Sequence, residues 1–291
     1  MKRLGSLAIL LVLASACRGG GERPLRIGSK NFSEQVILGE IAAQGLEARG
    51  VHVDRRLNLG GTFVCHQALK AGELGLYPEY TGTAFTAILA RKPVSDPELV
   101  RAEVAQEYRK RWNLVWSPPL GFENTFALVM RRDEAARLHI SKISDLAAHP
   151  EIRPGFGYEF LEREDGFPGL AKTYGLRFSQ RPVQMDLGLL YQALASRKVD
   201  LVAGNSTDGL IDAIGGVVLE DDRRYFPPYE AAFVLGAEVW KRPEVRAFFE
   251  SLAGTIDAAT MRKMNAAVDK DKRRPEDVAR EFLRRSRKPP P

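Results

Sequence analysis

Short strand patterns alternate regularly with amphipathic helix patterns along this chain, and this alternation limits the folds that the chain can adopt. An apolar strand at residues 25–28 precedes a helix pattern that ends before Gly50, and a second strand pattern covers residues 51–59. A turn and helix start at residues 60–62 then lead to a third strand at residues 74–77. Strand–helix–strand repeats of this kind predict an α/β lobe, which binds ligands at the carboxyl ends of its strands.

The alternation restarts in the middle of the chain and a last strand appears late. After a helix near residues 96–111, a strand at residues 125–130 opens a second region. Later patterns predict further βα units, a returning strand and two final helices, at residues 144–148, 187–196, 201–203, 232–235, 243–253 and 275–285. A first region that resumes after a second one is the connectivity expected of a hinged, two-lobed protein.

Local signals predict where the first helix starts and where aromatic side chains gather. Residues 31–34 (NFSE) have the pattern of an N-cap at Asn31 followed by a capping box. Loops at residues 77–83, 123–126 and 225–229 follow strands and are rich in aromatic or hydroxyl side chains. Each ring taken alone is well explained by burial in a core. Rings that converge on a cleft would attract a quaternary ammonium ion through their π faces.

The N-terminus has the pattern of an export signal. Lys2 and Arg3 precede a short apolar stretch, and small side chains at residues 14–16 (ASA) suit a cleavage site, so residues 1–16 are predicted to be a signal peptide. The next residue is Cys17, and a small-residue run that ends at a cysteine resembles the lipidation site of bacterial lipoproteins. Residues 17–24, with three glycines, are then a flexible tether. Ordinary cleavage that leaves Cys17 free is the alternative.

The distribution of charge argues against a nucleic-acid partner. The formal net charge is +6, but residues 17–260 contain 30 basic and 32 acidic side chains. The basic excess lies at the two ends, on the last predicted helix and in a basic, proline-rich tail at residues 286–291. A solvated helix face explains that excess, and weak attraction to anionic lipid headgroups is the alternative.

The sequence offers no clear catalytic or metal-binding constellation, so we expect no enzyme activity, cofactor or metal. Cys65 and His66 are adjacent on a predicted helix, where neighbouring side chains point about 100° apart and do not face each other. A buried structural thiol is the simpler interpretation of Cys65, and a catalytic Cys–His nucleophilic pair is the alternative. If Cys17 is acylated, Cys65 has no disulfide partner. The remaining histidines lack metal-ligand spacing.

Six segments together resemble one protein family. In chain order they are residues 28–35 (GSKNFSEQ), 77–83 (YPEYTGT), 124–128 (NTFAL), 159–166 (EFLEREDG), 206–209 (STDG) and 226–229 (FPPY). The sequence is similar to the substrate-binding proteins of glycine betaine, carnitine and choline ABC transporters. This resemblance implies a periplasmic-binding-protein fold, with lobe 1 at residues 25–122 plus 228–285 and lobe 2 at residues 123–227. The two hinge crossings are then expected near residues 121–125 and 225–229.

The resemblance also implies roles for individual residues. Tyr80 and Tyr229 match the aromatic cage of the family, and Phe126 stands where tyrosine is common, which keeps the π face. The fourth cage aromatic would fall at Asn205, so one wall carries an amide instead. The positions that hold the polar or carboxylate end of the ligand are matched by Lys30, Thr83 and Arg163, with Gln35 as a further candidate. Asp208 is expected to be a turn or helix cap rather than a ligand contact.

Under this resemblance the chain is expected to bind a small quaternary amine outside the cytoplasm and to deliver it to a separate ABC permease with its ATPase. The expected protein is a monomeric, membrane-anchored lipoprotein that faces the periplasm or the cell exterior. Glycine betaine, a related betaine, carnitine and choline are the candidate ligands. Asn205 leaves open a different solute, such as ergothioneine or a non-betaine.

Overall fold

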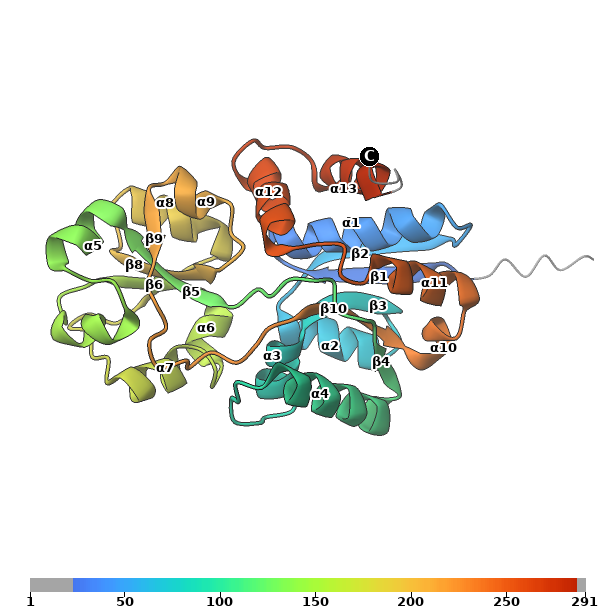
Figure 1. The fold of residues 1–291 in the computed structure, drawn as a ribbon, viewed down its shortest axis with the longest axis horizontal. Helices are drawn as coiled ribbons and strands as arrows, with labels where there is room; N and C mark the ends of the chain where they lie inside the picture. Colours follow the sequence, from blue (N-terminus) through green and yellow to red (C-terminus); the bar gives the residue numbers. More distant parts are fainter. Residues whose placement is uncertain (1–22, 287–291) are drawn as a thin grey trace, which may run out of the picture.

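The computed structural model describes residues 23–286, which form two lobes, each built around a five-stranded sheet (Figure 1). The predicted signal peptide, Cys17 and most of the predicted tether lie outside the described residues, as do residues 287–291 of the predicted tail. None of the helices among the described residues is long and apolar enough to span a bilayer.

The sheet of lobe 1 combines early strands with one strand from late in the chain. In spatial order the strands are β2 (Val53–Gly60), β1 (Leu25–Lys30), β3 (Leu76–Tyr80), β10 (Ala231–Gly236) and β4 (Leu114–Trp116). Strands β1, β2 and β3 are parallel, whereas β10 runs antiparallel to β3 and β4. The late strand β10 therefore returns the chain to the lobe in which it began.

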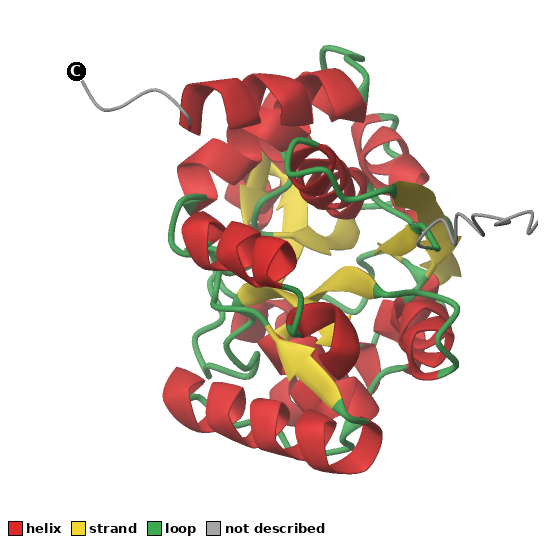
Figure 2. Cartoon of the chain, turned by 90° about the vertical axis from the view of Figure 1, so that its right-hand side faces the viewer, coloured by secondary structure: helices red, strands yellow, loops and turns green. Residues whose placement is uncertain are grey.

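Helices cover both faces of the first sheet (Figure 2). One face carries α1 (Ser33–Glu47), α11 (Pro243–Leu252), α12 (Ala258–Asp269) and α13 (Pro275–Ser286). The other face carries α2 (Thr62–Lys70), the single turn α3 (Thr81–Thr83), a π-helical turn (Ala84–Ile88) and α4 (Pro97–Trp112). The short helix α10 (Ala237–Trp240) follows β10. Each face has its own apolar core, so the sheet is buried on both sides.

Lobe 2 repeats this layered plan with shorter elements. Its sheet has the order β7 (Val183–Gln184), β6 (Pro154–Phe156), β8 (Leu201–Asn205), β5 (Phe126–Arg131) and β9 (Gly216–Val218). Its helical segments are α5 (Arg132–Leu138), a 3₁₀ turn (Ile143–Ala148), α6 (Tyr158–Glu162), α7 (Phe167–Tyr174), a 3₁₀ turn (Leu187–Leu189), α8 (Leu190–Ala195) and α9 (Leu210–Ala213). Two apolar clusters pack on this sheet, so lobe 2 also has cores of its own.

Two segments cross between the lobes and lie side by side (Figure 1). The outgoing crossing leads into β5 and the returning crossing leads into β10. They pair through an antiparallel bridge between Glu123 and Glu230, and the backbone N–H of Asn124 donates to the carbonyl of Tyr229 at 3.1 Å. The predicted two-lobed α/β fold is confirmed, whereas the bounds predicted for each lobe stay a prediction.

Several local predictions were wrong. Helix α1 begins at Ser33 with Phe32 as its N-cap and with no side-chain cap, so Asn31 does not cap it. By contrast, the helix start predicted at residues 60–62 is confirmed, since Gly61 is the N-cap of α2 and Thr62 is its first residue. The predicted loop at residues 77–83 is instead the end of β3 followed by α3. Helix α12 was not predicted, although Asp257 caps it and its buried methionines recur three residues apart.

The structure does not support a nucleophilic pair at Cys65 and His66. Both side chains are buried in α2, and the His66 ring packs edge-on against Tyr108 and Trp112 with centroid distances of 5.3 and 4.6 Å. Burial raises the pKa of Cys65 to about 12 and lowers the pKa of His66 to about 4. A protonated thiol beside a neutral imidazole in an apolar core is not an activated nucleophile.

Candidate functional site

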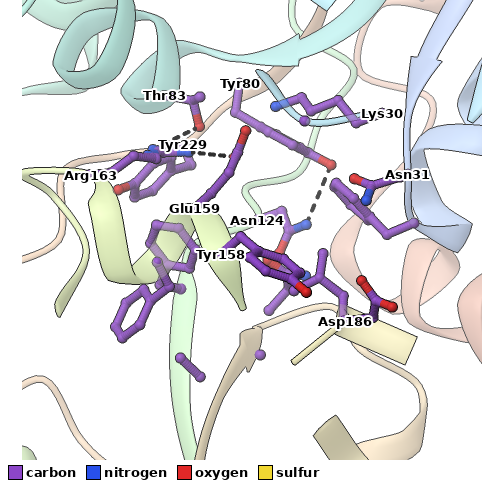
Figure 3. A pocket seen from close by; sticks show the side chains of 18 residues that line it. Lys30, Asn31, Tyr80, Thr83, Asn124, Tyr158, Glu159, Arg163, Asp186 and Tyr229 are labelled. Carbon is purple, nitrogen blue, oxygen red and sulfur yellow. Dashed lines mark hydrogen bonds and ion pairs between the residues drawn. The ribbon is translucent and has the colours of Figure 1, made fainter. Parts of the chain in front are cut away.

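A cavity of about 200 Å³ lies between the lobes and is lined by residues of both (Figure 3). Lobe 1 supplies the ends of β1 and β3, lobe 2 supplies the start of α6 and the facing ends of β5 and β8, and both crossings contribute. The residues that line the cavity include Lys30, Asn31, Tyr80, Thr83, Asn124, Phe126, Tyr158, Glu159, Arg163, Asp186, Asn205 and Tyr229. This is the position, beyond the carboxyl ends of parallel strands, that the alternation pattern predicts for a ligand.

The four predicted cage residues all line this cavity. Tyr80 ends β3, Tyr229 precedes β10, and Phe126 and Asn205 are register partners on β5 and β8. The rings of Phe126 and Tyr229 are arranged edge to face with their centroids 6.0 Å apart. Tyr80 and Tyr229 belong to the core of lobe 1, and Phe126 packs against the cores of both lobes. At these four positions the cavity therefore presents three aromatic rings and one amide.

Gly82 lets the returning crossing approach α3 closely enough to place Tyr229. A Cβ atom at Gly82 would lie 2.6 Å from the carbonyl oxygen of Pro228 and 2.7 Å from Cδ1 of Tyr229. A side chain at Gly82 would therefore clash with the backbone and with the Tyr229 ring, and the returning crossing would have to move away from α3.

Lys30 lies in the cavity wall with its charge already compensated. Its ammonium group is buried, forms an ion pair with Glu79 and donates to Oγ1 of Thr62 at 3.1 Å. The Nζ atom also lies 4.9 Å from the centroid of the Tyr80 ring. Lys30 therefore holds β1, β3 and α2 together where they meet the cavity.

Arg163 is compensated in the same way on the side of lobe 2. Its guanidinium forms a bidentate pair with Asp165 (Nε–Oδ1 2.8 Å, Nη2–Oδ2 2.5 Å) and reaches Oγ1 of Thr83 across the cleft at 3.4 Å. Its Cζ atom lies 5.1 Å from the centroid of the Phe126 ring. Lys30, Thr83 and Arg163 are thus brought together around the cavity.

Gln35 does not lie with the other three predicted polar residues. It is fully buried behind the wall, where its Oε1 accepts a hydrogen bond from the backbone N–H of Lys30 at 3.4 Å, and it does not line the cavity. Its contact supports the end of β1 rather than reaching the cavity.

Glu34 is a buried carboxylate that the sequence analysis did not single out as a site residue. It accepts four hydrogen bonds, from Tyr80 Oη (2.6 Å), Asn124 Nδ2 (2.8 Å), Thr207 Oγ1 (2.6 Å) and Asn265 Nδ2 (2.8 Å). Tyr80 and Asn265 belong to lobe 1, Asn124 to the outgoing crossing and Thr207 to lobe 2. Burial raises the pKa of Glu34 above its usual value, and the four donors act in the opposite direction.

Asp165 is a second buried carboxylate that bridges the lobes. Besides Arg163 of its own lobe, it accepts from Thr86 Oγ1 of lobe 1 at 2.6 Å and from Tyr229 Oη of the returning crossing at 2.7 Å. Burial alone would raise the pKa of Asp165, but the Arg163 guanidinium and the hydrogen bonds hold it below its usual value. Asp165 lies in the segment 159–166 that carried the resemblance, so its position was marked although its role was not.

Three acidic or amphipathic side chains at the rim were also not predicted: Tyr158, Glu159 and Asp186. Glu159 closes one side of the cleft, because its carboxylate accepts from the backbone N–H and from Oγ1 (3.1 Å) of Thr62 on lobe 1. Tyr158 and Asp186 are exposed. Their exposure explains why apolar periodicity gave no sign of them.

Asp208 holds the turn that carries Asn205. Its Oδ2 accepts from the backbone N–H of Asn205 at 2.8 Å and from Tyr191 Oη at 2.6 Å. Burial raises the pKa of Asp208 to about 6. Asp208 supports the turn from beneath and does not line the cavity, whereas Asn205 does.

Comparison with known proteins places this site in a family. The family described as "Substrate binding domain of ABC-type glycine betaine transport system" matches residues 23–285. The chain belongs to this family. Such domains are the extracytoplasmic binding components of ABC importers, which take up small molecules through a permease, and the family is one of transport proteins.

Two relatives share more than a third of their aligned residues with the chain. An ergothioneine transport permease/ergothioneine binding protein of Helicobacter pylori is 37% identical over 267 residues. The match covers 91% of this chain but 48% of that protein, so the chain spans about half the length of this relative. A glycine-betaine-binding protein of Pseudomonas aeruginosa is 37% identical over 278 residues, with 89% of this chain and 87% of that protein covered.

A solved structure agrees with the family and with the two-lobed fold. The crystal structure described as a glycine betaine/carnitine/choline ABC transporter superposes with a TM-score of 0.73 at 31% identity. The superposition covers 90% of this chain and 98% of that one.

Proposed function

We propose that this chain captures a solute bearing a quaternary ammonium group and releases it to an ABC permease. Glycine betaine or a related betaine, carnitine and choline are the candidate solutes. The supporting observation is that Tyr80, Phe126 and Tyr229 converge on one interlobe cavity from three separate segments of the chain. Each desolvated ring would contribute roughly 0.5–2 kcal/mol to binding a cation.

The electrostatics of the cavity fit a cationic guest. Lys30 and Arg163 are each compensated by a buried carboxylate, and the wall carries the further carboxylates of Glu159 and Asp186. We propose that Lys30, Thr83 and Arg163 border the end of the solute that lies opposite the cation. We also propose that residues 25–122 plus 228–285 and residues 123–227 move as two bodies when the solute binds and leaves.

Calorimetric titration of residues 23–286 with glycine betaine, carnitine and choline tests this proposal. We expect at least one of them to bind and Tyr229→Ala to abolish the signal. Tyr225→Ala is the matched control, because Tyr225 lies on the same crossing but does not line the cavity. If none of the quaternary amines binds while a different solute does, the cage hypothesis is overturned.

Asn205 favours a second candidate, a larger betaine such as ergothioneine, or a non-betaine solute. The amide stands opposite Phe126 in the β5–β8 register and leaves that wall without a ring. One relative, the Helicobacter protein, is named for ergothioneine. Replacement of the amide by a ring discriminates the two: Asn205→Tyr should strengthen glycine betaine binding and weaken binding of the larger solute.

We further propose that Cys17 is acylated after removal of residues 1–16 and anchors a monomeric binding protein to the membrane, with no catalytic activity of its own. The Cys17→Ser variant should then be recovered from the soluble extracytoplasmic fraction rather than from the membrane fraction. A wild-type protein that is also soluble would support ordinary cleavage instead.

A further inference from the structure

One polar atom in the wall of the cavity is buried without a partner. Asn124 lines the cavity and is 5% exposed, and its Oδ1 atom has no hydrogen-bond partner among the described residues. An unpaired buried acceptor costs about 1–3 kcal/mol, so such atoms in binding sites call for a donor from the ligand.

The orientation of this amide is fixed by its neighbours. Its Nδ2 atom donates to the carboxylate of Glu34 at 2.8 Å and to Tyr80 Oη at 3.4 Å, as Figure 3 shows for the second bond. A carboxylate accepts hydrogen bonds and does not donate them, so the amide nitrogen faces Glu34 and the carbonyl points away. The backbone of Asn124 is also held, because its N–H donates to the carbonyl of Tyr229.

The charged and phenolic donors of the buried wall are already engaged by the protein's own carboxylates. Lys30 donates to Glu79, Arg163 to Asp165, Tyr80 to Glu34 and Tyr229 to Asp165. The unpaired buried atom of Asn124 is an acceptor, as are the carboxylate atoms at the rim. The wall therefore offers acceptors where a ligand would have to supply a donor.

We infer that the solute carries a hydrogen-bond donor, a hydroxyl or an N–H group, which the Oδ1 atom of Asn124 accepts. This inference rests on the proposed function and narrows its ligand class. Glycine betaine has a quaternary nitrogen and a carboxylate but no donor, so it leaves Asn124 unpaired. A hydroxylated quaternary amine or a betaine with a ring N–H supplies the missing donor to Asn124. Either kind of solute can also carry a carboxylate.

The test uses choline and its O-methyl ether, which have the same charge and the same trimethylammonium group but differ in the donor. We expect calorimetry on residues 23–286 to show choline binding about tenfold or more tightly than the ether, with glycine betaine no tighter than the ether. Binding of choline and the ether with equal affinity would overturn the inference and leave the proposed function standing. Failure of all three to bind would instead overturn the proposed function for these solutes.

Two variants connect that preference to Asn124. Asn124→Ala should reduce the ratio of choline to ether affinity to about one, whatever it does to the absolute affinities. Thr207→Val is the matched control, since it removes another donor to Glu34 without touching the unpaired acceptor, and it should weaken both ligands by the same factor. If the ratio stays unchanged in Asn124→Ala, the side-chain carbonyl does not accept a hydrogen bond from the ligand. Thermal unfolding of each variant verifies that it is folded.

Discussion

Two buried carboxylates join the lobes, and they are stabilised in different ways. Glu34 belongs to lobe 1 and Asp165 belongs to lobe 2. Each accepts hydrogen bonds from its own lobe, from a crossing and from the other lobe. Asp165 faces a guanidinium, whereas the four donors to Glu34 are neutral hydroxyl and amide groups. Their pKa values accordingly move in opposite directions, down for Asp165 and up for Glu34.

This difference indicates different tasks at the two sides of the cavity. A carboxylate paired with a guanidinium keeps its charge over a wide pH range and fixes Arg163 in the wall. A carboxylate held only by neutral hydrogen-bond donors is protonated more easily. Glu34 is of this kind, and it orients Tyr80 and Asn124 on the opposite side of the cavity from Arg163.

Asp165→Asn should be the most damaging change. It leaves the buried Arg163 guanidinium without its bidentate partner, and removal of one member of a buried ion pair costs about 3–5 kcal/mol. Urea unfolding measures the loss. Asp133→Asn, which breaks an exposed pair with Arg197, is the control and should change little. A loss at Asp165 no larger than that of the control would refute the assignment.

Glu34→Gln should destabilise the protein less, by about 2 kcal/mol in the same urea experiment. The substitution leaves no cation unpaired, but the new amide nitrogen must face donors that previously met an oxygen. Glu47→Gln, at the exposed end of the same helix, provides the reference. A cost equal to that of Asp165→Asn would mean that the dipoles and the guanidinium are equivalent.

The two variants should change acid sensitivity in opposite directions. The contribution of Glu34 is fully present below about pH 4.3 and is lost as the pH rises through its raised folded pKa. The contribution of Asp165 is present above about pH 3.9 and is lost as the pH falls through its lowered folded pKa. Between pH 7 and pH 3, Glu34→Gln should therefore lose more thermal stability than wild type, and Asp165→Asn should lose less. Parallel curves for all three proteins would contradict this.

The smallest effects are expected at the hydroxyls that cross the cleft. Thr86→Val and Thr207→Val each remove one donor between the lobes, worth about 1 kcal/mol, while leaving the cores of both lobes intact. This loss should disfavour closure and weaken solute binding several-fold, with little change in unfolding. Calorimetry and urea unfolding, run on both variants, separate the two effects. A variant that loses stability but not affinity would place its threonine in the fold rather than in closure.

The sequence predicted the fold well because the signals that build it are local and repeated. Strand and helix periods, together with a late returning strand, were sufficient for two α/β lobes. Segments that carried the resemblance contain Tyr80, Phe126 and Tyr229, and the segment 206–209 begins next to Asn205. All four residues line one cavity.

The roles of Glu34 and Asp165 could not be predicted, because they depend on partners far apart in the chain. Glu34 was expected to be part of a capping box, and its four donors come together only when β3, the outgoing crossing, the 205–208 turn and α12 pack around the start of α1. Gln35 does not line the cavity although Lys30, Asn31 and Phe32 of the same motif do, because a motif names neighbours in sequence and not the direction in which each side chain points.

The burial of Cys65 makes the two-lobed body convenient for optical measurement. Cys65 is the only cysteine in residues 23–286, and with its pKa raised to about 12 it stays a thiol that maleimide dyes do not reach. Single cysteines introduced at exposed positions on opposite lobes, Val64 on α2 and Leu189 at the end of a 3₁₀ turn, would be the reactive sites for a pair of dyes. Energy transfer between the dyes would convert solute capture into a colour change, so the protein could report the concentration of its own ligand.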